Sequence, residues 1–153
     1  MKLPGHFIFI AAIVLAGCDN ADDGFQKSAN GLSYKIISDG RGDPLMPGQF
    51  LKIQVKQMYG DSVLSDTRKT MPQFQHYDSN AMSAQAWNIF SNARSGDSII
   101  FKVKYDSAFA RAHPELVRKN KELITSVKVL KILPDSQSVR MDYELEKESR
   151  KRN

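Results

Sequence analysis

The chain has 153 residues, of which 41% are hydrophobic and 25% charged, and its formal net charge is +5. This length allows one globular domain with tails, and the composition is not that of a disordered chain. The basic residues are scattered, and the sequence has neither a glycine-rich phosphate loop nor a basic helix with stacking aromatic residues. We therefore expect no nucleic-acid partner. The single cysteine, Cys18, excludes an internal disulfide.

The first residues are typical of a secretory signal. One lysine precedes an apolar run, Phe7–Leu15, which is too short to span a bilayer comfortably. The run ends in Leu15-Ala16-Gly17-Cys18, which resembles the lipobox of bacterial lipoproteins, where the signal is removed before the cysteine and the cysteine is acylated. We therefore expect a signal peptide at 1–17, lipidation of Cys18 and a lipid-anchored protein of the bacterial cell envelope, facing the periplasm or the cell surface. An ordinary signal peptide with a coincidental cysteine is the alternative.

Residues 18–30 are polar, which predicts a flexible tether. Beyond it, alternation of apolar and polar residues predicts strands at 31–37 and, most clearly, at 50–59. A short return strand is expected at 63–67, after a glycine turn. Residues 68–79 are polar and include a proline, which predicts a loop with an edge segment.

Helical spacing of apolar residues and the absence of Gly and Pro predict a helix at 83–94. A glycine turn and an alternating strand at 99–105 follow, then a long connection at 107–120 and a last strand at 122–133. The charged C-terminal tail, residues 134–153, is expected to form either an exposed helix or a frayed, solvated segment. In the last strand one face carries Leu123, Thr125, Val127 and Val129, and the other is partly covered by Ile124, Leu130 and Ile132. One helix among alternating strands indicates an α+β domain.

Over residues 31–133, the order of these elements resembles the FKBP-type peptidyl-prolyl cis-trans isomerase family. No single motif is specific, but their order is. The stretches that carry the resemblance are Gly31-Leu32-Ser33-Tyr34 with Gly40 and Gly42, Pro47-Gly48 before Leu51-Lys52-Ile53-Gln54-Val55, Gly96-Asp97, Phe109-Ala110 where Tyr-Gly usually stands, and Leu123 to Ile132.

This resemblance implies an FKBP-like fold, a twisted antiparallel sheet wrapped around one short helix with an apolar pocket between them. It implies rotation of Xaa-Pro bonds in a proline-containing peptide or unfolded protein, by a monomer that needs no nucleophile, metal or cofactor. His76 and His113 have no cysteine or acid at ligand spacing, so a metal site is not expected.

At the positions that line the family's pocket, this sequence has fewer aromatic residues than the family. Counting back from Gly96 puts Ala86 where the family has a tryptophan on the pocket floor, with Trp87 one residue away. One residue turns a helical side chain by about 100°. Either Trp87 forms the floor, or Ala86 leaves a wide pocket. For Trp87 the alternative to a pocket role is packing at the surface or between elements. The other expected pocket residues are Gln57, Leu64, Phe74, Met82, Phe109 and Thr125, and plain core packing is the alternative for Leu64, Phe74 and Phe109.

Three functions remain open on this sequence. The leading one is an isomerase, weak or with altered preference. The second is a non-catalytic peptide-binding or chaperone module that uses the same cleft. The third is a small envelope-assembly component whose domain recognises another protein.

Overall fold

The computed structural model of the chain describes residues 24–28, 33–39, 42–104 and 122–152. The expected signal peptide and lipidation site, Cys18, and the expected pocket residue Phe109 lie outside these ranges. In the described residues the helices are α1 (Ala84–Phe90) and α3 (Ser136–Lys151), with a 3-10 turn, η1 (Thr67–Lys69). The strands are β1 (Gln26–Lys27), β2 (Ser33–Ile37), β3 (Phe50–Tyr59), β4 (Ser62–Asp66), β5 (Gln73–His76), β6 (Ser98–Lys104) and β7 (Glu122–Leu133).

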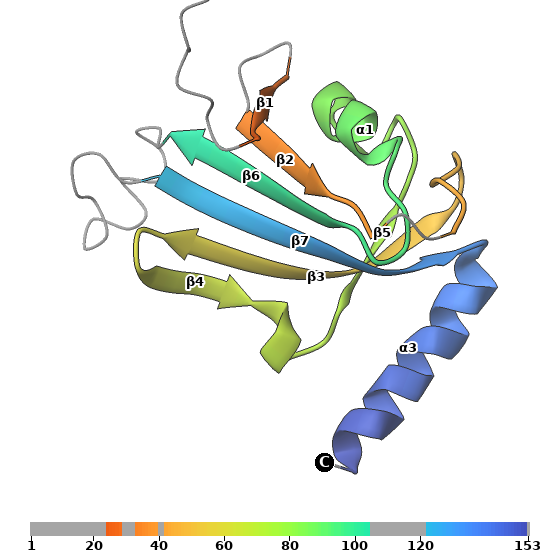
Figure 1. Cartoon of the computed structure of the whole chain (residues 1–153). Coiled ribbons are helices and arrows are strands. Elements are labelled where there is room, and N and C mark those ends of the chain that lie inside the picture. The colour runs from red at the N-terminus through yellow and green to blue at the C-terminus, as the bar shows by residue number, and fades with distance from the viewer. Residues whose placement is uncertain (1–23, 29–32, 40–41, 105–121, 153) are drawn as a thin grey trace, which may run out of the picture.

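The described strands form one curved antiparallel sheet in the order β1-β2-β6-β7-β3-β4. β5 also pairs with β3, along Phe50–Ile53, whereas β4 pairs with Lys56–Tyr59 of the same strand. The two short strands therefore share one edge of β3. Figure 1 shows α1 on one side of this sheet and α3 on the other.

The core lies between α1 and the concave face of the sheet. Alternation along β3 buries Leu51 and Ile53 on this face, while Lys52 points to the outer face. The buried core residues are Leu45, Leu51, Ile53, Tyr77, Ile89, Phe90, Ala93, Ile99, Val127 and Val129. β3 and β7 thus supply four of these core residues, and α1 supplies Ile89 and Phe90.

The short helix α1 begins at a capped serine. The Ser83 hydroxyl oxygen accepts a hydrogen bond from the Ala86 amide at 3.2 Å, as expected of a serine N-cap. Its C-terminal part buries Ile89 and Phe90, and the next turn buries Ala93. The helix ends at Phe90 rather than at residue 94, because Ala93 N–H donates to Phe90 O in a closing turn.

A buried carboxylate holds the turn between α1 and β6. Asp97 is 1% exposed and accepts hydrogen bonds from Ser38 Oγ (2.9 Å), Asp39 N (3.0 Å) and Arg94 N (2.9 Å). Gly96 precedes it with φ +94°, a conformation that side chains disfavour. This carboxylate joins the end of β2 to the exit of α1, and so fixes α1 over the sheet.

The last strand departs from simple alternation. The pairing of β7 with β3 shifts register between Lys52 and Ile53, so that Leu51 faces Ile132 while Ile53 faces Val129. Leu130 has no partner in β3 and forms a bulge there. The prediction that Ile132 lies on the outer face is therefore wrong, because the bulge returns it to the core side, where it packs against the buried cluster.

The segment expected as a flexible tether includes two residues that are strand. Gln26 and Lys27 pair with Tyr34 and Ser33 as β1. The Phe25 ring lies 3.8 Å from Lys102 Nζ, a cation-π distance, and the Tyr34 hydroxyl donates to Gln26 Oε1 at 3.1 Å.

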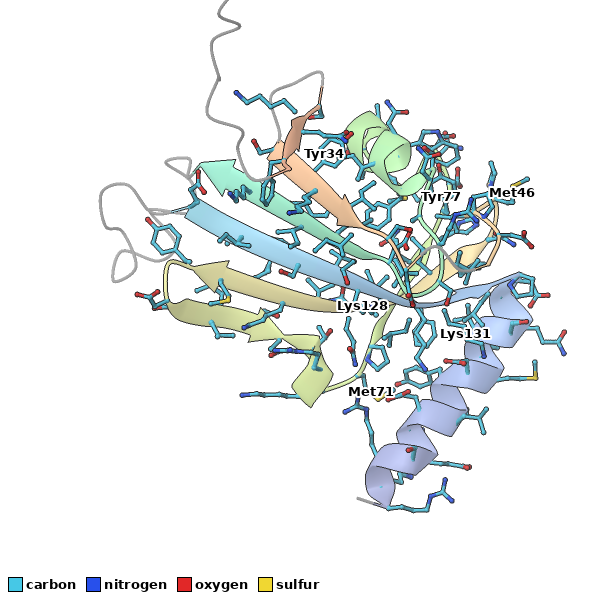
Figure 2. All side chains as sticks on the ribbon, in the orientation of Figure 1. Tyr34, Met46, Met71, Tyr77, Lys128 and Lys131 are labelled. Carbon is cyan, nitrogen blue, oxygen red and sulfur yellow. The ribbon has the colours of Figure 1, made fainter. Side chains whose placement is uncertain are left out.

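Residues 134–153 were expected to form either an exposed helix or a frayed, solvated segment. In the structure Ser136–Lys151 form a helix, α3. Asp135 caps it, accepting from Ser138 N at 2.7 Å. On the outer face of the sheet, the Tyr143 ring meets Phe74 edge-on at a centroid distance of 6.2 Å. Figure 2 shows Lys131 beside α3, whereas Tyr77 lies beside α1 on the other side.

Four charged side chains, the α3 ion-pair cluster, tie this helix to β3 and β7. Its members are Lys52, Lys131, Asp142 and Glu146. Asp142 is 8% exposed and lies 2.6 Å from Lys52 Nζ and 3.0 Å from Lys131 Nζ. Lys52 Nζ also lies 2.8 Å from Glu146 Oε2.

The cluster shifts the titration of its own members. Burial raises the pKa of Asp142, but hydrogen bonds from the two lysines outweigh it, and the pKa falls below its usual 3.8. The hydrogen bond from Lys52 lowers the pKa of Glu146 below 4.5. Burial lowers the pKa of Lys52, but hydrogen bonds to both carboxylates outweigh it and raise that pKa. At neutral pH Lys52, Asp142 and Glu146 are therefore charged.

Candidate functional site

An apolar hollow of about 370 Å³ lies between α1 and the concave face of the sheet. We call it the α1 hollow. Residues from β3, β5, β6 and β7 and from α1 with the loop before it meet here. Its lining consists of Ile53, Gln75, Ala81, Met82, Ala86, Phe90, Phe101 and Val127. Apart from Gln75, the described lining is hydrocarbon and thioether, so the hollow suits an apolar group that leaves water.

The elements of the fold place these side chains by simple periodicity. Ile53, Phe101 and Val127 come from three neighbouring strands and share the concave face. Ala86 and Phe90 are four residues apart on α1, which puts them on one helical face. The rings of Phe90 and Phe101 lie 6.2 Å apart at 44°, so aromatic surface bounds one side of the hollow.

The structure separates Ala86 from Trp87. Ala86 lines the hollow, whereas the Trp87 ring stacks on Tyr77 with centroids 4.0 Å apart and an interplanar angle of 8°. The buried Tyr77 hydroxyl donates to the Trp87 carbonyl oxygen at 3.0 Å, and burial raises the pKa of that hydroxyl. Two contacts therefore hold Trp87 away from the hollow, and the methyl group of Ala86 leaves its floor open.

Comparison with known proteins gives likeness in structure alone. No family model and no curated protein matches the sequence. FkpA from Escherichia coli is similar in structure with a TM-score of 0.52 at 17% identity, over 74% of this chain and 54% of that one. A peptidyl-prolyl cis-trans isomerase from Pseudomonas syringae pv. tomato gives 0.51 at 15% identity, over 74% and 84%. The chain thus spans about half the length of FkpA.

The fold is FKBP-like. The expected class, a twisted antiparallel sheet around one short α-helix, is confirmed. The C-terminal helix α3 adds a second layer on the outer face of this FKBP-like sheet.

The expected pocket residues separate into groups on this FKBP-like frame. Met82 and Ala86 line the α1 hollow. Gln57 and Thr125 face each other across β3 and β7, on the concave side but outside the lining. Leu64 lies at the irregular pairing of β4 with β3.

Phe74 lies on the other side of the sheet. It faces Lys52 across the β3–β5 pair, and its ring meets Tyr143 of α3. Because β5 alternates, Gln75 takes the concave side in its place.

Several lining residues carried no functional signal in the sequence. Ile53, Phe101 and Val127 were expected as the apolar rows of strands, and Phe90 as part of the apolar face of the helix. Gln75 and Ala81 fell in stretches without periodicity. The hollow is therefore lined mainly by residues of the core, and these stay accessible because Ala86 has a small side chain.

The described residues contain no group of three or more potential metal ligands. Within the same residues, no helix is long and apolar enough to cross a membrane.

Proposed function

We propose that this protein is an FKBP-type peptidyl-prolyl cis-trans isomerase of the bacterial cell envelope. The observation that carries the proposal is the α1 hollow, an apolar cavity of about 370 Å³ between the helix and the sheet of an FKBP-like fold. Rotation about an Xaa-Pro bond breaks amide resonance, with a barrier of about 18–20 kcal/mol. The reaction moves no covalent bond, so it requires a fitted surface and no nucleophile.

The lining suits this chemistry because its described side chains, apart from Gln75, offer no hydrogen bond to the imide. A proline ring between Phe90, Phe101 and Met82 exchanges water for hydrocarbon. The imide then loses the solvent hydrogen bonds that favour its planar, polar form. Binding that favours the twisted imide over the planar one lowers the rotation barrier.

A second function, a non-catalytic peptide-binding or chaperone module, is favoured by the thin aromatic lining. Among the described lining residues only Phe90 and Phe101 are aromatic, and Trp87 stacks on Tyr77 instead. Such a hollow binds an apolar side chain of a partly folded protein without distinguishing the twisted imide.

A prolyl-turnover assay separates the two functions. The full chain, purified in detergent, is added to a proline tetrapeptide, and cis–trans exchange is followed by NMR. For the isomerase we expect acceleration that Phe101→Ala removes and Phe74→Ala keeps, because Phe74 lies on the outer face. Binding of unfolded chains without acceleration of exchange would instead support the chaperone.

The envelope location rests on the sequence Leu15-Ala16-Gly17-Cys18. Labelled palmitate should enter the wild-type chain in a bacterial host and should not enter Cys18→Ser. Equal labelling of both chains would exclude a lipid anchor at this position.

A further inference from the structure

Gln75 is the one polar side chain among the described residues that line the α1 hollow. It stands on β5, opposite Leu51 of β3, and is half-buried. One N–H of its carboxamide donates to the His76 carbonyl oxygen at 3.1 Å. Within the described part of the chain, the other N–H and the Oε1 acceptor have no protein partner.

The main-chain N–H groups of Ala81, Met82 and Ala86, which line the hollow, are already used. Ala81 N and Met82 N both donate to Asp78 O, at 3.0 and 3.1 Å, and Ala86 N donates to Ser83 Oγ at 3.2 Å. Ile53, Phe101 and Val127 belong to paired strands of the sheet. A carbonyl oxygen that enters with an apolar ligand therefore finds a free donor, among these lining groups, at the Gln75 carboxamide.

We propose that Gln75 binds the main chain of the peptide whose proline occupies the hollow. A peptide group beside an apolar cavity loses water and costs free energy unless it is paired. A carboxamide offers a donor and an acceptor side by side, which matches the N–H and C=O of a peptide group. Gln75 thereby recognises the backbone, and tolerates different side chains beside the proline. This inference rests on the proposed isomerase function.

The role of Gln75 in this proposal is binding rather than rotation. A donor on the imide oxygen would favour the planar, resonance-stabilised form and slow the reaction. Gln75 instead holds a neighbouring peptide group, equally in the planar and twisted states. Uniform binding of this kind lowers KM and leaves kcat unchanged.

The test compares the same substitution at two positions of one strand. Gln75→Leu should raise KM for a proline tetrapeptide about two- to tenfold, the effect of one or two neutral hydrogen bonds, with kcat unchanged. Gln73→Leu should leave both constants unchanged, because Gln73 is exposed and does not line the hollow. Thermal melting of both variants checks folding, because Gln75→Leu also removes the bond to His76.

Ester peptides, in which one backbone N–H near the proline is replaced by oxygen, test the contact itself. By calorimetry, one ester position should weaken binding to the wild-type protein severalfold and should cause no loss with Gln75→Leu. An ester penalty that persists in Gln75→Leu, or equal KM values for both leucine variants, would overturn the role of Gln75 while the isomerase proposal stands. A wild-type chain that neither binds nor turns over the peptide would overturn both.

Discussion

Asp142→Asn should release α3 from the sheet. The Asp142 carboxylate lies between two lysines at 2.6 and 3.0 Å and is nearly buried. The Lys131 side chain is 57% exposed, so its pair contributes at most about 1 kcal/mol. The Lys52 side chain is 12% exposed, and losing one partner of a buried pair costs roughly 3–5 kcal/mol. Because Lys52 keeps Glu146 at 2.8 Å, we expect a total loss of about 2 kcal/mol.

Hydrogen exchange should detect this loss locally, because α3 can leave the sheet without unfolding it. About 2 kcal/mol corresponds to a roughly 30-fold faster exchange of α3 amides, whereas β3 and β7 amides should be unchanged. Glu144→Gln is the matched control, since Glu144 is 61% exposed and pairs with Lys147 at 3.5 Å. The reasoning is refuted if both variants exchange alike, or if β3 and β7 lose protection together with α3.

Three further predictions concern acid, the α1–β6 turn and the floor of the hollow. The pKa values of Asp142 and Glu146 are lowered in the folded protein, so these carboxylates stabilise the contact of α3 with the sheet fully above about pH 4.5. As the pH falls through the lowered pKa values, this stabilisation should be lost, and hydrogen exchange of α3 amides across a pH series should become faster. Gly96→Ala should lower the free energy of unfolding by roughly 2–3 kcal/mol, because the new Cβ would lie 2.8 Å from Asp39 Oδ2 at a residue with positive φ. The control Gly48→Ala also has a positive φ but open space around the new Cβ, and should cost only about 1 kcal/mol. Equal costs of the two variants in urea melts would contradict the contact with Asp39. Ala86→Trp should raise kcat/KM for the proline tetrapeptide about two- to tenfold by adding an aromatic floor, and a fall would show that the open floor is required.

The sequence predicts those strands in which the alternation of apolar and polar residues matches a buried face and an outer face. β3 runs over Phe50–Tyr59 as expected, because one face meets the core and the other meets charged groups. The bulge at Leu130 could not be predicted, since it depends on how two strands with unequal residue counts pair. β1 was missed because Gln26 and Lys27 are polar, and their pairing with β2 depends on backbone bonds that leave no apolar pattern.

The site was harder to predict than the fold. The register counted from Gly96 allowed either Ala86 or Trp87 on the floor, and the stack on Tyr77 that decides between them joins residues in different elements. Phe74 was expected in the pocket because the family resemblance puts a loop phenylalanine of the pocket at this position. The outer face also offers apolar cover here, since α3 lies over it, and this follows only from tertiary structure.

The pairing of β1 with β2 limits how far the domain can stand from a lipid attached at Cys18. Six residues separate that cysteine from Phe25, whose ring already rests on Lys102. Even fully extended, the chain from Cys18 to Phe25 reaches roughly 25 Å, less than the diameter of the domain itself. If Cys18 carries the proposed lipid anchor, the domain would bind its substrates close to the bilayer surface, within about the thickness of one protein molecule. Polypeptides that emerge from, or settle onto, that surface would then be its natural clients, ahead of chains dissolved deeper in the compartment.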